Sequence, residues 1–311
     1  MQIPWNTLPP GSRTDYTLEI EPGKTIPVTV LKGAAPGKTL AVSAGVHGCE
    51  YVGIQTARRL PALIRPEKIH GTLVLLPLLN AGGLFRGVRQ VMPEDGKDLN
   101  RVFPGDPAGS FSQKLAAVIE REIYPAIDFL LDLHGGDMNE ELTPVIFYPA
   151  AAEPAVTRAA LEAAKRLSPA LLVASQAKTG PYSYAARKGI PAILLERGGL
   201  GRWTEQEVSQ DIEDILRLMA HLGMTGGADN PLPHRMIDDA VYEAAPEDGF
   251  WYPFTAAGSR VKAGQALGEL QRLDGTPIKT FTARWDGVIL YHTVSLGAAK
   301  GDPLIAYGKW E

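Results

Sequence analysis

Residues Lys38–Gly45 read KTLAVSAG, a mostly apolar run that ends in glycine and predicts a buried β-strand. A helical pattern follows from about Glu50 to Ile64. Gly71–Leu79 (GTLVLLPLL) is a continuous apolar run, typical of a strand that is covered on both faces. Strand, helix and strand in this order indicate an α/β protein with a largely parallel sheet.

The alternation continues on both sides of this segment. Two strands around a turn at Pro22–Lys24 are expected between Thr14 and Leu31. Further strands are expected at Phe129–Leu133, Val145–Tyr148 and Ile190–Leu195, and further helices at Phe111–Ile123, Pro154–Leu167 and Glu205–Leu222. In such sheets ligands collect beyond the carboxyl ends of the strands, so we expect functional residues there.

The pattern changes after Met224. Residues 225–233 (TGGADNPLP) are rich in Gly, Pro and small polar residues and predict a linker. From Ile237 to Glu311 only short strand-like runs remain, and two of them, VKAGQAL (261–267) and AAKGDPL (298–304), resemble each other. We therefore expect an α/β domain over residues 1–228 and a small all-β, sandwich-like domain over residues 229–311, folded from two similar halves.

Composition excludes several classes of partner. The 311 residues carry a formal net charge of -4, which gives no support for a nucleic-acid or anionic-membrane partner. Cys49 is the single cysteine, so no intrachain disulfide can form. Met1–Ile20 shows no signal-peptide pattern, and no apolar run approaches the length of a membrane span. We expect a cytoplasmic protein that acts on a small molecule, and homo-oligomerisation stays open.

Three residues form a candidate metal site. His47 and Glu50 lie three positions apart at a strand-to-helix junction, so an imidazole and a carboxylate can point into the same space. His134 directly follows a predicted apolar strand and precedes two glycines. Catalytic zinc typically has three protein ligands of this kind and one position left for water. Alone, the first pair also fits a solvated turn, and His134 also fits a buried packing residue; Asp132, on the same strand face, could orient an imidazole or cap backbone.

The run DLNRVFPG, Asp98–Gly105, places Asn100 and Arg101 in a loop rich in Gly and Pro. A guanidinium there suits a substrate carboxylate, and Arg86 and Arg89 lie in the loop before it. A surface salt bridge is the alternative for Arg101. Several cations converging on one loop of an acidic protein favour a site for a substrate anion.

Glu196 follows the apolar residues Ile193–Leu195. Burial among apolar residues raises the pKa of a carboxyl, which suits a general base. An ion pair with the adjacent Arg197 is the competing interpretation.

Taken in order, HGCE (47–50), DLNRVFPG (98–105), LDLHGG (131–136) and ILLERGG (193–199) resemble the aspartoacylase / succinylglutamate desuccinylase family, relatives of the zinc carboxypeptidases. The resemblance covers about residues 35–225. The C-terminal segment is similar to the sandwich-type domain of the predicted-deacylase branch. The family's fold implies a carboxypeptidase-like mixed, largely parallel sheet flanked by helices.

The resemblance also implies roles. His47, Glu50 and His134 would bind one Zn²⁺ per chain, and Glu196 would be the catalytic carboxylate. Asn100 and Arg101 match the pair that grips the substrate's carboxylate. Arg89 would stabilise the oxyanion, with Arg86 as a substitute. Arg197 stands where many relatives carry an uncharged residue, and it would lower the pKa of Glu196 or bind a second anion. The activity implied is hydrolysis of the amide bond of a small N-acyl amino acid.

Two other functions stay open. The same apparatus could serve a metallocarboxypeptidase that acts on peptides, although a C-terminal β domain could cap the cleft against them. A biotinyl or lipoyl carrier has a similar GQxL/GDxL rhythm but needs a lysine at a hairpin tip, and the segment expected there, Ala283–His292, has none. Cys49 is expected to face the core as a small apolar residue.

Overall fold

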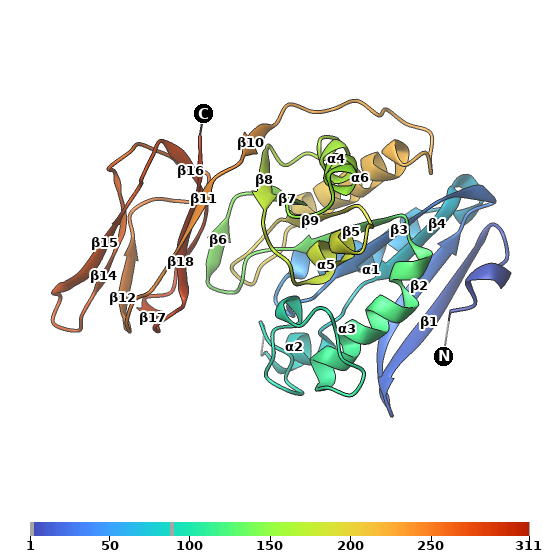
Figure 1. The fold of residues 1–311 in the computed structure, drawn as a ribbon, viewed down its shortest axis with the longest axis horizontal. Coiled ribbons are helices and arrows are strands. Elements are labelled where there is room, and N and C mark those ends of the chain that lie inside the picture. The colour runs from blue at the N-terminus through green and yellow to red at the C-terminus, as the bar shows by residue number, and fades with distance from the viewer. Residues whose placement is uncertain (1–2, 88–89, 311) are drawn as a thin grey trace.

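A nine-stranded sheet flanked by helices forms the larger part of the molecule in this computed structural model, which describes residues 3–87 and 90–310 (Figure 1). Its strand order is β1-β2-β4-β3-β5-β9-β7-β8-β10, and the central pairings from β4 through β9 are parallel. The strands are β1 (Ser12–Glu21), β2 (Lys24–Lys32), β3 (Ala35–Ala44), β4 (His70–Leu76), β5 (Phe129–His134), β7 (Val145–Pro149), β8 (Leu171–Ser175), β9 (Ala192–Glu196) and β10 (Arg235–Ile237). The predicted mixed, largely parallel sheet is confirmed.

Helices cover both faces of this sheet. The first face carries α1 (Tyr51–Leu63), α4 (Pro154–Ala164) and α6 (Glu205–His221). The second carries α3 (Phe111–Glu122) and α5 (Pro181–Arg187), while α2 (Ala81–Arg86) precedes the loop that leads to α3. Short 3-10 turns occur at Trp5–Thr7, Pro66–Lys68, Leu99–Arg101 and Tyr124–Ala126. None of the helices within the described ranges is long and apolar enough to cross a membrane.

Strand alternation decides which face each site residue reaches. In β5, Leu131 and Leu133 pack with α1, α4 and α6, whereas Leu130 packs with α3 and α5. Since successive side chains point to opposite faces, Asp132 and His134 share the face of Leu130. This confirms the expectation that Asp132 and His134 lie on one strand face.

The C-terminal region consists of antiparallel strands in two sheets, as the sequence predicts (Figure 1). Trp251, Phe281 and Tyr307 belong to one buried cluster drawn from both sheets, which is the core of a sandwich. The first sheet has the order β11-β18-β16-β13, and the second β15-β14-β12-β17. The strands are β11 (Ala240–Ala244), β12 (Gly249–Pro253), β13 (Arg260–Val261), β14 (Ala266–Gln271), β15 (Pro277–Thr282), β16 (Gly287–Thr293), β17 (Gly297–Ala298) and β18 (Pro303–Lys309).

The two similar sequence runs make equivalent turns. In each, the glycine N–H donates to an alanine carbonyl across the sandwich, and a polar side chain closes the turn on the backbone. The matching bonds are Gly264 to Ala283 (2.7 Å) and Lys262 N–H to Gln265 Oε1 (3.0 Å) in one half, and Gly301 to Ala245 (2.8 Å) and Ala299 N–H to Asp302 Oδ2 (2.8 Å) in the other. These shared hydrogen bonds support the expected folding from two similar halves.

The segment expected to match a carrier's hairpin tip was placed wrongly. Ala283–His292 is not a tip, because β16 takes up most of it and is hydrogen-bonded to β13 and β18. The exposed hairpin turn joins β14 to β15 at residues 272–276 (RLDGT), which also lack a lysine. The carrier interpretation therefore has no attachment residue in either place.

Two short strands connect the large sheet with the C-terminal region. β10 lies beyond residue 228 but still pairs with β8 at the edge of the large sheet. β6 (Glu140–Leu142) pairs in turn with β16 of the C-terminal region (Figure 1). The division at residues 228 and 229 stays a prediction. Strand pairing crosses it twice, through β10 with β8 and through β6 with β16.

Candidate active site

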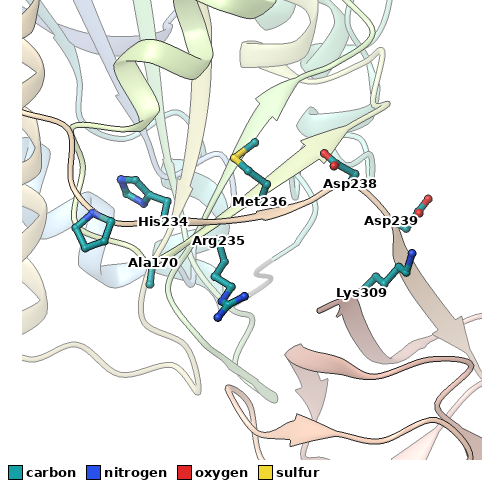
Figure 2. Close-up of a pocket in the computed structure, with 8 residues that line it drawn as sticks. Ala170, His234, Arg235, Met236, Asp238, Asp239 and Lys309 are labelled. Atoms are coloured by element: carbon teal, nitrogen blue, oxygen red, sulfur yellow. The ribbon is translucent and has the colours of Figure 1, made fainter. Parts of the chain in front are cut away.

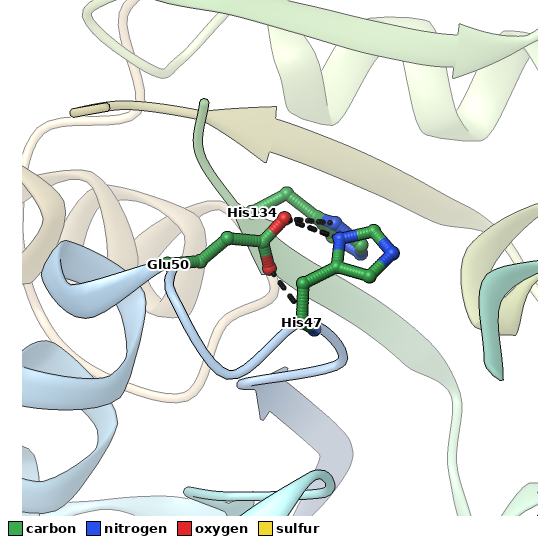
Figure 3. A group of neighbouring side chains, drawn as sticks. All are labelled: His47, Glu50 and His134. Atoms are coloured by element: carbon green, nitrogen blue, oxygen red, sulfur yellow. Dashed lines mark hydrogen bonds and ion pairs between the residues drawn. The ribbon is translucent and has the colours of Figure 1, made fainter. Parts of the chain in front are cut away.

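His47, Glu50 and His134 lie close together, as Figure 3 shows. They stand at the carboxyl ends of β3 and β5. His47 lies in the loop after β3, Glu50 stands at the N-terminus of α1, and His134 is the last residue of β5. Their potential ligand atoms all lie within 4.8 Å of one another. Glu50 Oε1 is 2.6 Å from His47 Nδ1 and 3.1 Å from His134 Nδ1. The three predicted residues are thus brought together by segments 84 positions apart.

The outer nitrogen of each imidazole lies against a second carboxylate. His47 Nε2 is 3.2 Å from Asp98 Oδ1, and His134 Nε2 is 3.2 Å from Asp132 Oδ2. Asp132 is itself held by the Ser43 hydroxyl, which donates to its Oδ1 at 2.6 Å. Histidines that bind metals typically donate their other N–H to a carboxylate in this way. The donor set and its supporting carboxylates therefore fit a zinc ion held by both Nδ1 atoms and Glu50.

The charges of these histidines and carboxylates shift one another's pKa values. Burial acts to lower the pKa of His47, but Glu50 and Asp98 outweigh it and raise that pKa to about 10. Burial opposes ionisation of Glu50, yet His134 and His47 hold its pKa down at about 2. In the metal-free group the carboxylates of Glu50, Asp98 and Asp132 offset the charge of the two imidazolium rings, and a divalent cation would replace the two protons.

Glu196 extends from the carboxyl end of β9, directly beside His134 in the parallel register. Its Oε2 is buried and has no hydrogen-bond partner among the described residues. Burial raises the pKa of Glu196 to about 8, with Glu50 adding to the effect and His134 opposing it. A carboxyl group in this environment is suited to accept and return a proton.

Arg197 does not pair with Glu196, which corrects both sequence-based interpretations of this arginine. Its guanidinium lies 2.9 Å from Asp211 and 2.9 Å from Asp214, on α6, and is 2% exposed. The reason is strand alternation: Glu196 and Arg197 are adjacent, so their side chains leave opposite faces of the sheet. Arg197 therefore attaches α6 to the sheet, away from the candidate metal site.

Of the residues expected to bind the substrate, some line the pocket of the candidate ligands and others do not. Asn100 and Arg101 line the same pocket as the three candidate ligands. Arg101 lies at its rim, 68% exposed, and donates from Nη1 to the Asn100 carbonyl at 3.2 Å. Arg86, the exposed last residue of α2, is not among the described residues that line this pocket. Arg89 lies outside the described residues.

Two glycines allow the surrounding loops to approach closely. A Cβ at Gly48 would overlap the backbone N of Leu84, so this glycine lets α2 pack on the His47 loop. A Cβ at Gly180 would overlap Asn100 Oδ1, and Gly180 also has a φ of 90°. These two glycines therefore let the His47 loop pack against α2 and let the Asn100 loop pack against the start of α5.

The pocket has a volume of about 350 Å³ and includes residues that the sequence interpretation did not select. They are Gln90, Asp98, Asp137, Glu140, Tyr291 and Pro303. Burial raises the pKa of Glu140 to about 8, and Glu196 and Asp137 add to it. Tyr291 and Pro303 come from β16 and β18, so the C-terminal region forms part of the wall. Asp98 was within reach of sequence reasoning, since it begins the DLNR run, whereas no local pattern marks Tyr291.

Cys49 lines the pocket instead of facing the core alone. Its thiol donates to Asp137 Oδ1 at 3.2 Å, and burial together with Glu50 raises its pKa. A thiol whose pKa is raised is a poor nucleophile. The residue therefore serves as a buried hydrogen-bond donor.

A larger cavity of about 530 Å³ lies by the linker to the C-terminal region, away from the candidate ligands (Figure 2). His234 is the histidine in its lining, and both ring nitrogens already lie near backbone carbonyl oxygens, at 3.0 Å from Pro169 and 2.9 Å from Lys165. We therefore assign the chemistry to the smaller pocket.

The chain belongs to the succinylglutamate desuccinylase/aspartoacylase family, because the model of that family's catalytic domain matches residues 36–222. An N-alpha-acetyl-L-2,4-diaminobutyric acid deacetylase from Halomonas elongata is 29% identical over 290 residues, which are 90% of this chain and 84% of the relative. The family resemblance seen in the four sequence motifs is thereby confirmed, and the family is one of deacylases.

Solved structures agree with this assignment. A succinylglutamate desuccinylase/aspartoacylase from Rhodobacter sphaeroides superimposes with a TM-score of 0.83 at 29% identity, covering 93% of this chain and 90% of the other. The product-bound ectoine utilization protein EutE (DoeB) from Ruegeria pomeroyi shares the fold, with a TM-score of 0.83, 24% identity and coverage of 92% and 90%. Both matches include the C-terminal region.

Proposed function

We propose that this protein is a zinc-dependent hydrolase that cleaves the amide bond of a small N-acyl amino acid. The observation that carries the proposal is the convergence of two Nδ1 atoms and one carboxylate within 4.8 Å, with an unpaired buried carboxylate oxygen of Glu196 beside them. Zinc bound by His47, Glu50 and His134 would supply Lewis acidity toward the amide carbonyl and water. Deacylation by the Halomonas relative supports the reaction class.

The chain's own residues account for the proton transfer and for substrate orientation. Glu196 takes the proton of the attacking water and returns it to the leaving amine, and its raised pKa allows both steps. Arg101 and Asn100 bind the amino-acid carboxylate at the rim of the pocket. Asp98 and Asp132 orient the imidazoles. Arg89 is proposed to stabilise the oxyanion.

A small substrate is favoured over a peptide. Tyr291 and Pro303 of the C-terminal region contribute to a pocket of about 350 Å³, which suits an acylated amino acid better than an extended chain. The competing carboxypeptidase function predicts faster cleavage of dipeptides than of N-acetyl amino acids.

The test combines metal analysis with a substrate panel. Elemental analysis of the purified protein should find close to one zinc per chain, and His134→Ala should lose it. The zinc-loaded protein should release free amine from N-acetyl amino acids faster than from dipeptides of the same amino acids. Full metal retention by both His134→Ala and His47→Ala would end the zinc assignment, and a preference for dipeptides would end the deacylase proposal.

A further inference from the structure

The candidate pocket is rich in carboxylates, and most of them already have a role. Its lining includes Glu50, Asp98, Asp137, Glu140 and Glu196, against Arg101 as the arginine among the described lining residues. Glu50 and Asp98 lie against the imidazoles, and Glu196 serves proton transfer under the proposed function. Asp137 accepts from the Cys49 thiol and from the Met138 N–H.

Glu140 is the carboxylate that has no such use. In the part of the chain that the structure describes, its side chain makes neither a hydrogen bond nor an ion pair, although it lines the pocket. Its backbone, by contrast, is firmly held: its N–H donates to Asp137 O at 3.1 Å, and its carbonyl accepts from the Leu200 N–H at 3.1 Å. Gly136 packs so closely that a Cβ there would come within 2.8 Å of the Glu140 carbonyl oxygen.

β6 directs this side chain into the pocket. Glu140 and Glu141 are adjacent on the strand, so they point to opposite sides. Glu141 points away and lies 2.7 Å from His292 Nε2 of the C-terminal region. The pairing of β6 with β16 sets Glu140 opposite Thr293, while Tyr291 lines the pocket two residues along β16.

We propose that Glu140 binds a positively charged amino group on the substrate, and that the substrates are therefore N-acylated diamino acids with one acylated and one free amine. The inference rests on the proposed deacylase function and names its substrate class. The pKa of Glu140 is raised while its half-buried side chain has no partner, and an ammonium group would lower that pKa and bind the carboxylate through a charge-assisted hydrogen bond. A second metal ion is a poorer occupant, because the described residues bring ligand atoms together only at His47, Glu50 and His134.

The charged residues of the pocket favour the same class of substrate. Arg101 offers one cation for the carboxylate that every N-acyl amino acid carries. A second carboxylate in the substrate would meet Glu140 and Asp137 and be repelled, whereas an ammonium would be attracted. The selectivity should therefore follow the order cationic, neutral, anionic for side chains of similar size.

Three substrates of similar length test this order on the zinc-loaded protein: Nα-acetyl-L-2,4-diaminobutyrate, N-acetyl-L-norvaline, in which a methyl group replaces the ammonium, and N-acetyl-L-aspartate. The wild type should prefer the cationic substrate in kcat/KM by about 10- to 150-fold over norvaline's derivative, the range for one charge-assisted hydrogen bond. Glu140→Gln should abolish that preference, which is read as the ratio of the two kcat/KM values so that a change in turnover common to both substrates cancels. Glu213→Gln, an equal change of net charge on the outer surface of α6, should keep the preference.

Binding separates this inference from the proposed function. Calorimetry with 2,4-diaminobutyrate and norvaline, the two amine products, should show tighter binding of the diamine to the wild type but not to Glu140→Gln. If all three substrates are cleaved without regard to charge, or if Glu140→Gln keeps the preference, the inference is overturned while the deacylase stands. If none is cleaved, the proposed function fails, and the calorimetric preference alone decides whether Glu140 recognises an ammonium.

Discussion

Replacing Arg197 with methionine is expected to destabilise the fold strongly without altering the residues that line the pocket. The guanidinium is 2% exposed and pairs at 2.9 Å with both Asp211 and Asp214, whose side chains are fully buried. Methionine has a similar length and is apolar, so it fills most of the space while it leaves both carboxylates without a cation. The loss is therefore electrostatic rather than a loss of packing.

The magnitude follows from burial. Removing one partner of a buried ion pair costs about 3 to 5 kcal/mol because the other charge stays uncompensated. For a chain of 311 residues, with an unfolding entropy of about 2.1 cal/mol/K per residue, that corresponds to a fall in melting temperature of roughly 5 to 8 °C. Arg65→Met is a matched control: Arg65 is 72% exposed and pairs with Glu67 at the surface, where such pairs contribute about 0 to 1 kcal/mol.

The loss should also depend on pH. In the wild type burial raises the pKa of Asp211 to about 7, although Arg197 opposes this. Without the cation the pKa of Asp211 rises further, so the folded variant binds more protons than the unfolded chain above about pH 4. Its stability must then fall as pH rises from about 4 through 7 and beyond, and the gap to the wild type narrows toward pH 4.

Thermal and urea unfolding of wild type, Arg197→Met and Arg65→Met between pH 4.5 and 8 would measure these effects. The triple variant Arg197→Met, Asp211→Asn, Asp214→Asn should recover part of the stability at pH 8, since it removes the stranded charges. An Arg197→Met variant that is as stable as the wild type but has a displaced pH–rate profile would refute this reasoning. That result would mean that Arg197 acts on Glu196 after all.

Four further outcomes are expected. Asp132→Asn should weaken zinc binding by about 10- to 100-fold in a competition titration with a chromophoric chelator, and unchanged affinity would contradict its role toward His134. Glu196→Gln should keep its zinc and lose about 10²- to 10⁴-fold in kcat, so near-normal turnover would point to another base. Arg101→Ala should lower kcat/KM by about 10- to 150-fold for N-acetyl amino acids and leave their carboxamide analogues unaffected; equal losses on both would make the arginine structural. Glu50 and Asp98 outweigh the opposing effect of burial and raise the pKa of His47 to about 10, so zinc must displace protons when it binds. The zinc affinity should therefore rise about tenfold per pH unit for each proton displaced between pH 6 and 8. A flat profile would show that His47 is already neutral.

The central part of the fold could be predicted because its signals are local. β3, β4, β5 and β9 are apolar runs of the length of a strand, and their predicted positions agree with the structure within a few residues. The three candidate ligands follow from the same signals, since each lies at the end of such a run or at the next helix. Even the separation of Glu196 from Arg197 was available from strand alternation, which the sequence interpretation did not apply to the residues after Leu195.

Other elements depend on contacts between distant segments. α5 is a seven-residue helix that begins with proline, too short for the apolar stripe that marks a longer amphipathic helix. β8 is a five-residue apolar run, as long as β9, and the sequence interpretation passed over it. β10 and β6 have three residues each and exist because β8 and β16 pair with them. The pocket residues supplied by these contacts, Glu140 and Tyr291, were missed for the same reason.

The C-terminal region influences the pocket through backbone pairing and not as a loosely placed cap. β6 belongs in sequence to the α/β part but is hydrogen-bonded to β16, with Glu140 opposite Thr293. A shift of one residue in that register would turn Glu140 out of the pocket and Glu141 into it. Both are carboxylates, but the shift would break the contact between Glu141 and His292, which lies at 2.7 Å, and thus be opposed. The orientation of Glu140 toward the pocket is therefore fixed by the C-terminal sheet, whose strand β16 also supplies Tyr291 to the pocket wall.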